Sequence, residues 1–143
     1  MSIVCVSGYF DPIHIGHIDY FKRAKELGDL LLVIVNNDEQ AALKKGRAFM
    51  PADERIQIIK ELKCVDLVVK SIDIDRTVIK TLGSLFPIPK YFCNGGDQNN
   101  NTIPETQVCL ERGIELRDGF GNKIQSSSWL IEKCRENSTS MIL

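Results

Sequence analysis

The sequence predicts an α/β protein, a Rossmann-like three-layer sandwich built around a five-stranded parallel sheet. Short apolar runs alternate along the chain with segments of helical period, which is typical of strands joined by right-handed helical crossovers. The second of these runs, residues 30–35, is apolar on both faces, as expected for a strand buried between two helical layers. A length of 143 residues fits a single domain.

The first half of the chain supplies three strands and two helices. Residues 3–6 form the first expected strand. A helix over 16–27 follows, because its apolar side chains recur every three positions and Gly28 is placed to end it. The second strand, 30–35, is followed by the polar residues 36–38. The basic segment 44–50 is expected to be a mobile loop. Pro51 suits the first turn of a second helix, and 65–69 is the third strand.

The second half continues the alternation. A helix is expected over 77–86, where two prolines follow it, and a fourth strand over 91–93, which runs into an Asn-Gly-Gly turn. Residues 104–112 form a helix closed by Gly113, and 114–116 form the fifth strand. A last helix is expected over 126–135. The sequence therefore predicts one domain over 1–136 and a tail over 137–143.

Composition excludes several classes of protein. Eighteen basic and nineteen acidic residues give a net charge of −1, which argues against a nucleic acid or an anionic membrane as the main partner. The longest apolar run has six residues, whereas a membrane span needs about 20. The five cysteines lie at least 16 residues apart, without metal-site or redox spacing. We expect reduced core thiols in a cytoplasmic protein.

The end of the first strand carries the strongest functional signal. Residues 8–17 read Gly-Tyr-Phe-Asp-Pro-Ile-His-Ile-Gly-His. His14 and His17 are the chain's two histidines, and their spacing puts both rings on one face of a helix. A helix N-terminus attracts anions, and Gly8 and Gly16 allow close backbone approach. The segment predicts a phosphate site, the alternative being two histidines that only cap a helix.

This frame, Gly-x-Phe-Asp-x-x-His-x-Gly-His, resembles the cytidylyltransferase-like branch of the HIGH-motif nucleotidyltransferases. Glycerol-3-phosphate cytidylyltransferases and heptose 1-phosphate adenylyltransferase domains belong to this branch. Its members transfer a nucleotidyl group from a nucleoside triphosphate to a phosphorylated small molecule and release pyrophosphate. The other HIGH-motif enzymes, the class I aminoacyl-tRNA synthetases, are far longer than 143 residues.

The resemblance implies roles for individual residues. The catalytic residues are expected to be His14, His17, Lys44 and Lys45. The expected nucleotide-binding residues are Gly8, Tyr9, Phe10, Gly16, Arg55, Asn94, Gly95, Gly96, Asp97, Ser126, Ser127 and Ser128. Asp11 and Asp38 are expected to bind the acceptor. Magnesium is expected with the nucleoside triphosphate, and no carboxylate cluster predicts a dedicated metal site.

Simpler interpretations of these residues stay open. The lysines suit a solvated surface loop, and Arg55 a surface salt bridge. Residues 94–97 suit an ordinary turn, the serines a helix cap, and Asp11 an Asx turn before a proline.

The sequence also departs from the family pattern at two places. Gln125 precedes the three serines where members often carry arginine, and Lys63 stands where Arg-x-Val-Asp is common.

We therefore expect an enzyme that transfers AMP or CMP from ATP or CTP to a phosphorylated sugar or polyol, in the manner of ADP-heptose-type or cell-surface precursor synthesis. The expected partners are these two substrates and a second copy of the chain in a homodimer, with no nucleic acid and no membrane. Three alternatives remain: a non-catalytic nucleotide-binding regulatory module, a structural subunit that only dimerises, and a flavin- or pantetheine-type adenylyltransferase.

Overall fold

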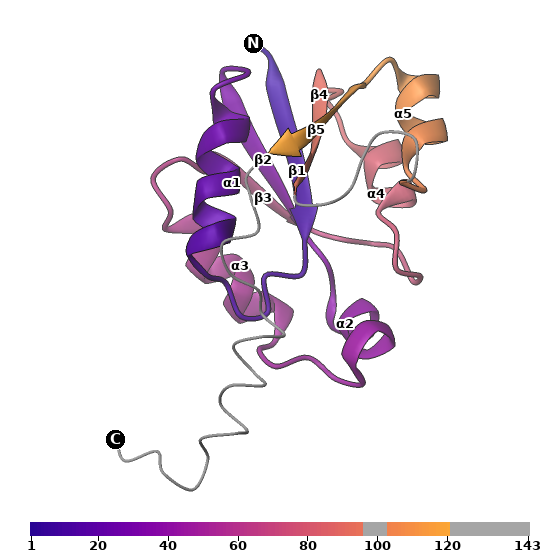
Figure 1. The fold of residues 1–143 in the computed structure, drawn as a ribbon. Coiled ribbons are helices and arrows are strands. Elements are labelled where there is room, and N and C mark those ends of the chain that lie inside the picture. The colour runs from indigo at the N-terminus through magenta and orange to yellow at the C-terminus, as the bar shows by residue number, and fades with distance from the viewer. Residues whose placement is uncertain (96–102, 121–143) are drawn as a thin grey trace, which may run out of the picture.

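The computed structural model describes residues 1–95 and 103–120 (Figure 1). Five strands and five helices are arranged in the order β1 (Ile3–Gly8), α1 (Ile15–Lys25), β2 (Leu30–Val35), α2 (Asp38–Lys45), α3 (Ala52–Lys60), β3 (Leu67–Lys70), α4 (Ile79–Ser84), β4 (Tyr91–Gly95), α5 (Thr106–Arg112) and β5 (Glu115–Phe120).

All five strands form one parallel sheet in the order β3-β2-β1-β4-β5. The predicted five-stranded parallel sheet is confirmed. The chain runs outward from β1 through β2 to β3 and then returns to the other side of β1 as β4. The strand order therefore reverses between β1 and β4. In open α/β sheets, ligands bind beyond the carboxyl ends of the strands at this point.

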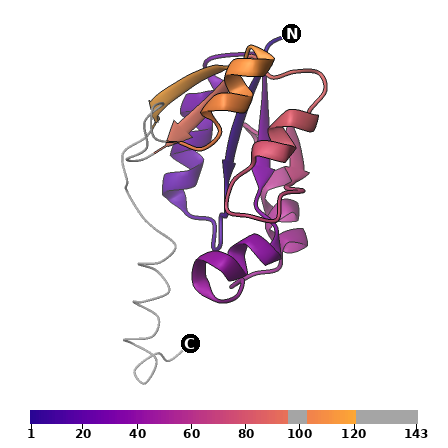
Figure 2. The same ribbon diagram turned by 90° about the vertical axis from the view of Figure 1, so that its right-hand side faces the viewer.

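Helices cover both faces of the sheet, which confirms the three layers (Figure 2). Successive side chains of a strand point to opposite faces of the sheet, so β1 contributes side chains to the hydrophobic core on each face. Val4 and Val6 pack with Phe21 of α1 and Ile59 of α3 in one core. The other core contains Cys5 together with Val78, Leu82 and Cys109 from the α4 and α5 side. The four cysteines that the structure describes are free thiols, and three of them are buried, as predicted.

The helix α2 is the main departure from the sequence prediction. The expected mobile loop over 44–50 is wrong at its first two positions, because Lys44 and Lys45 form the last turn of α2. The helix begins with a capping box in which Asn37 and Gln40 each accept the other's backbone N–H. This Asn-x-x-Gln pattern was the available sequence signal. α2 lies beyond the sheet at the end where β1 and β2 finish (Figures 1 and 2).

Other boundaries differ by a few residues. The first helix ends at Lys25 rather than at residue 27, and Gly28 instead allows close packing, since a Cβ there would lie 2.8 Å from a methyl of Val4. The third strand begins two residues late because Asp66 caps the neighbouring strand, accepting the Leu31 N–H at 2.8 Å. The expected last helix, the tail and the domain end lie outside the described residues. None of the helices that the structure describes has the length and apolarity to cross a membrane.

Candidate nucleotide site

The two histidines form a reciprocal cap at the start of α1. The His14 Nδ1 accepts a hydrogen bond from the Gly16 backbone N–H, and the His17 Nδ1 accepts one from the His14 backbone N–H, both at 3.1 Å. The rings stack with 3.6 Å between their centres. A neutral imidazole that accepts at Nδ1 carries its proton on Nε2. The cap therefore fixes both tautomers, and neither Nε2 bonds to any residue that the structure describes.

Burial lowers the pKa of both histidines, so both are neutral at pH 7. Burial lowers the pKa of His17 to about 3, and the positive charges of Lys44 and Lys45 add to this effect. Burial also lowers the pKa of His14. Phe10 covers the His17 ring edge-on, with 4.9 Å between ring centres. The pair thus presents two neutral N–H donors in a cationic environment, which suits an anionic ligand such as a phosphate.

Arg55 holds the segment after β1 in place from inside the protein. Its Nη1 donates to the carbonyls of Tyr9 at 2.6 Å and Asn36 at 2.8 Å, and its Nε donates to the Met50 carbonyl at 2.9 Å. Its Nη2 pairs with Asp38 Oδ1 at 2.9 Å. The alternative of a surface salt bridge is wrong, because the Arg55 side chain is fully buried. These bonds direct the guanidinium toward protein carbonyls and Asp38.

Asp11 has a comparable internal role. Its buried carboxylate accepts the backbone N–H groups of Phe49 at 2.7 Å and Met50 at 2.6 Å. The Nζ of Lys45 lies 3.3 Å from the same carboxylate. Asp11 therefore holds residues 49–50, which precede α3, against the loop that follows β1. The expected acceptor-binding role for Asp11 has no direct counterpart in these contacts.

The remaining predicted residues of the β1 exit surround the histidines. The Nζ of Lys44 lies 4.4 Å from the centre of the Tyr9 ring, a cation–π distance. Gly8 permits a close approach, but the approaching group is Phe10, whose ring would lie 2.6 Å from an added Cβ. Gly16 supplies the N–H that caps His14. The structure thus brings the β1 exit and the end of α2 together.

The β4 exit lies beside this cluster because β4 pairs with β1. Asn94 is buried, and Gly95 is the last residue of β4. The Tyr20 hydroxyl donates to the Cys93 carbonyl, which ties α1 to this exit. We did not single out Tyr20 from the sequence, and its position three residues after His17 was the available signal. The predicted site residues Gly96, Asp97, Ser126, Ser127 and Ser128 lie outside the described residues.

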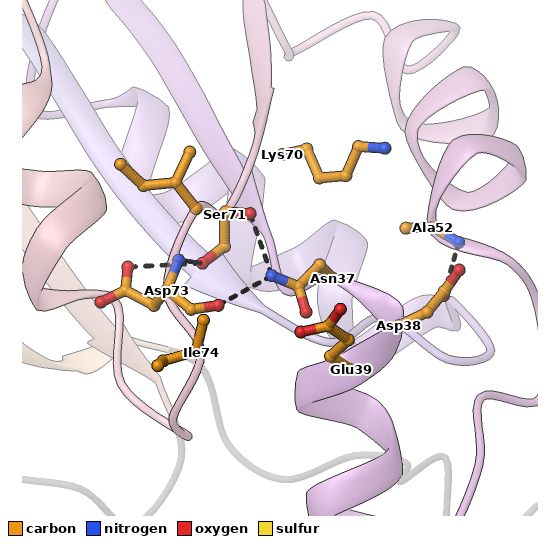
Figure 3. Close-up of a pocket in the computed structure, with 9 residues that line it drawn as sticks. Asn37, Asp38, Glu39, Ala52, Lys70, Ser71, Asp73 and Ile74 are labelled. Carbon is orange, nitrogen blue, oxygen red and sulfur yellow. Dashed lines mark hydrogen bonds between the residues drawn. The ribbon is translucent and has the colours of Figure 1, made fainter.

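A separate cavity of about 330 Å³ opens at the ends of β2 and β3 (Figure 3). It is lined by Asn37, Asp38, Glu39, Ala52, Lys70, Ser71, Ile72, Asp73 and Ile74. The Asn37 amide donates to the carbonyls of Ser71 and Asp73. The Gln40 amide donates further along the same loop, to the carbonyls of Asp75 and Thr77. These bonds fix the loop after β3 against α2. Apart from Asp38, none of the residues lining this cavity was predicted as a site residue from the sequence.

Residues 5–142 match the family described as cytidylyltransferase-like. The chain belongs to this family. The resemblance drawn from the histidine motif is thereby confirmed, and the family is one of nucleotidyltransferases.

Two groups of curated relatives are similar to this member of the family. It is 34% identical over 140 residues to the bifunctional protein HldE of Citrifermentans bemidjiense, covering 92% of this chain and 27% of that protein. It is 46% identical over 82 residues to the FAD synthase of Pyrococcus horikoshii, covering 55% of each chain. The chain thus spans about a quarter of the first relative and about half of the second.

Solved structures have the same architecture. The lipopolysaccharide core biosynthesis protein of Thermoplasma volcanium has a TM-score of 0.64 at 30% identity, covering 83% of this chain and 94% of that one. A protein of unknown function from Archaeoglobus fulgidus has a TM-score of 0.60 at 17% identity, covering 87% of this chain and all of that one, and it shows the fold alone. Both matches agree with the Rossmann-like sandwich described above.

Proposed function

We propose that the protein transfers a nucleotidyl group from ATP or CTP to a phosphorylated sugar or polyol and releases pyrophosphate. The observation that carries this proposal is the reciprocal cap of His14 and His17. It places two fixed Nε2–H donors at the start of an eleven-residue helix, beside the point where the strand order reverses. Relatives with HldE and lipopolysaccharide core names favour a sugar phosphate as the acceptor.

In this reaction an oxygen of the acceptor phosphate attacks the α-phosphorus. A new P–O bond forms, and the bond from the α-phosphorus to the oxygen bridging the β-phosphate breaks, so that pyrophosphate leaves. The two Nε2–H groups stabilise negative charge on the phosphate oxygens, and the side chains of Lys44 and Lys45 add positive charge. Catalysis of this kind depends on positioning rather than on covalent participation of the protein.

Magnesium would enter as part of the metal–nucleotide substrate. Within residues 1–95 and 103–120 there is no cluster of three or more metal-ligating side chains. The Asp11 carboxylate beside the site is already bonded to two backbone N–H groups and lies near Lys45. Phosphate oxygens and water would therefore supply most of the ligands, as is usual for nucleotide-bound magnesium.

The test is a pyrophosphate-release assay with ATP and CTP, each in the presence of magnesium, across a panel of acceptors. The panel contains hexose 1-phosphates, glycerol 3-phosphate and FMN. We expect release with one nucleotide and a sugar or polyol phosphate, and loss of release in His17→Ala. No release with any pair would refute the proposal and favour a non-catalytic nucleotide-binding module. Cytoplasmic location and a homodimer remain predictions, the second testable by sedimentation.

A flavin adenylyltransferase is the second candidate. The 46% identity to an archaeal FAD synthase over 82 residues favours it. Two results together would establish this alternative. ATP and FMN would release pyrophosphate, and ATP with a hexose 1-phosphate or glycerol 3-phosphate would release none.

A further inference from the structure

We propose that Tyr20 is a positioning residue for the nucleotide. Its hydroxyl group ends the pairing of β1 with β4 and so sets the distance between the histidines and the β4 exit. The inference rests on the proposed transfer reaction, in which one nucleotide spans these two places. Tyr20 acts through the strands and through α1 rather than by contact with the nucleotide.

β1 and β4 pair along only part of their length. The pairing joins residues 4–5 of β1 to residues 91–92 of β4, although β1 continues to Gly8 and β4 to Gly95. β1 stays paired with β2 as far as Gly8, and β4 stays paired with β5 as far as Gly95. Beyond residues 5 and 92 the sheet therefore opens between β1 and β4, where the strand order reverses.

The Tyr20 hydroxyl takes the place of the next hydrogen bond in this ladder. It donates to the Cys93 carbonyl of β4, and the same oxygen interacts with the Ser7 backbone N–H of β1. Bonds in a parallel ladder are evenly spaced, so one more step of the observed register would join the Ser7 N–H directly to the Cys93 carbonyl. The hydroxyl thus stands between two groups that would otherwise bond to each other, and it holds the strands apart.

The chemistry of a phenol suits this bridge. Burial raises the pKa of the Tyr20 hydroxyl well above its usual range, so the group stays protonated at neutral pH. A protonated hydroxyl donates one hydrogen bond and accepts another, whereas a carboxylate only accepts and an ammonium only donates. Tyr20 can therefore satisfy a carbonyl on one strand and an N–H on the other.

Tyr20 also connects the opened strands to the histidines. His14, His17 and Tyr20 follow one another at intervals of three residues at the start of α1, and side chains at this spacing lie on one face of a helix. A shift of α1 along the sheet would break the bond from Tyr20 to the Cys93 carbonyl. The bond therefore fixes the distance from the two histidine Nε2–H donors to the β4 exit.

This distance matters for a ligand that binds at both places. Under the proposed function the histidines hold the phosphates, and Asn94 and Gly95 at the end of β4 are the expected contacts of the nucleoside. A ligand gains affinity from two subsites only when their separation matches its own length. Tyr20 therefore contributes to the affinity for the whole nucleotide, and not to the affinity for its triphosphate alone.

The test measures binding of ATP, CTP and inorganic tripolyphosphate, each with magnesium, by isothermal titration calorimetry. The variant is Tyr20→Phe, which keeps the ring and removes the hydroxyl. Tyr91→Phe is the matched control, because Tyr91 is also partly buried but begins β4, at the end away from the β4 exit. Amide hydrogen exchange reports on the Ser7 N–H, and melting curves verify that both variants fold.

For the wild type we expect one nucleotide to bind more tightly than tripolyphosphate. Tyr20→Phe should weaken binding of that nucleotide by at least about tenfold and change the affinity for tripolyphosphate by less than about twofold. The Ser7 amide should exchange faster in this variant, because its N–H loses the hydroxyl oxygen. Tyr91→Phe should keep the wild-type value of all three quantities.

Unchanged nucleotide affinity in Tyr20→Phe, an equal loss of tripolyphosphate affinity, or an equal loss in Tyr91→Phe would overturn the positioning role while leaving the transfer reaction intact. A wild type that binds no nucleotide would refute the proposed function, and the positioning role with it. Nucleotide binding that depends on Tyr20, without pyrophosphate release from any acceptor, would refute the transfer reaction alone.

Discussion

Replacing Arg55 by methionine separates a positioning role from direct contact with the nucleotide. The substitution keeps a long side chain but removes the donors to the carbonyls of Tyr9, Asn36 and Met50. A buried acceptor left without its hydrogen bond costs about 1–3 kcal/mol. The bond to the Asn36 carbonyl is buried and those to the Tyr9 and Met50 carbonyls are half-buried, so the three together give a loss of about 3 kcal/mol in the free energy of unfolding. The lost pairing with Asp38 adds less, because that carboxylate is 54% exposed.

The assay is thermal unfolding together with steady-state kinetics. In a domain of this size about 3 kcal/mol corresponds to a fall in Tm of at least roughly 6 °C. Arg23→Met is the control, because the half-exposed Arg23 pairs with Asp19 four residues earlier in the same helix, and such i,i+4 pairs contribute about 0.3–0.5 kcal/mol. Arg55→Lys should recover little, since an ammonium cannot reproduce the planar set of donors. A variant Arg55→Met with the wild-type Tm but a much higher KM for the nucleotide would refute this reasoning.

Three further predictions concern the histidines. His14→Ala should lower kcat for pyrophosphate release by about 10²–10³-fold, the usual effect of removing one donor to a developing anion; a change only in KM would contradict it. Multiple-bond ¹H–¹⁵N spectra should show both histidines as neutral Nε2–H tautomers at pH 7; a protonated Nδ1 on either ring would contradict the cap. Below pH 6.5 an unfolded histidine binds a proton that folded His17, with a pKa of about 3, does not. Stability should therefore fall as the pH drops from 6.5 toward 3, and His17→Gln should show a shallower fall in denaturant titrations; equal slopes would rule this contribution out.

Local sequence patterns predicted the sheet because strand and helix periods are properties of short segments. The apolar run at 30–35 and the three-residue repeat after Gly16 each correspond to an element in the structure. The αL position that ends α5 was predictable from Gly113 alone, since its φ of 70° suits glycine. The helix α2 was missed because its second half is rich in lysine, and the Asn37 and Gln40 cap at its start was overlooked.

The site was predictable only in part, for a different reason. His14 and His17 are three residues apart, so their proximity follows from local geometry. The roles of Arg55 and Asp11 depend on contacts with chain segments up to 46 residues away. The family resemblance implied nucleotide binding for Arg55 and acceptor binding for Asp11, but tertiary structure directs the polar groups of both into the protein. The cavity also arises from segments that are separate in sequence and meet only in the folded chain.

The bracing of α2 limits how the protein can respond to a ligand. Its first turn is bonded to four carbonyls of the loop after β3 through the amides of Asn37 and Gln40, and Lys45 near its other end lies against the buried Asp11. A segment held at both ends has little conformational freedom left to lose. Lys44 should therefore reach a triphosphate by rotating about its side-chain bonds, while Lys45 and the helix backbone stay in place. Free and nucleotide-bound forms should superpose closely over α2, and little of the binding energy should be spent on ordering this part of the chain.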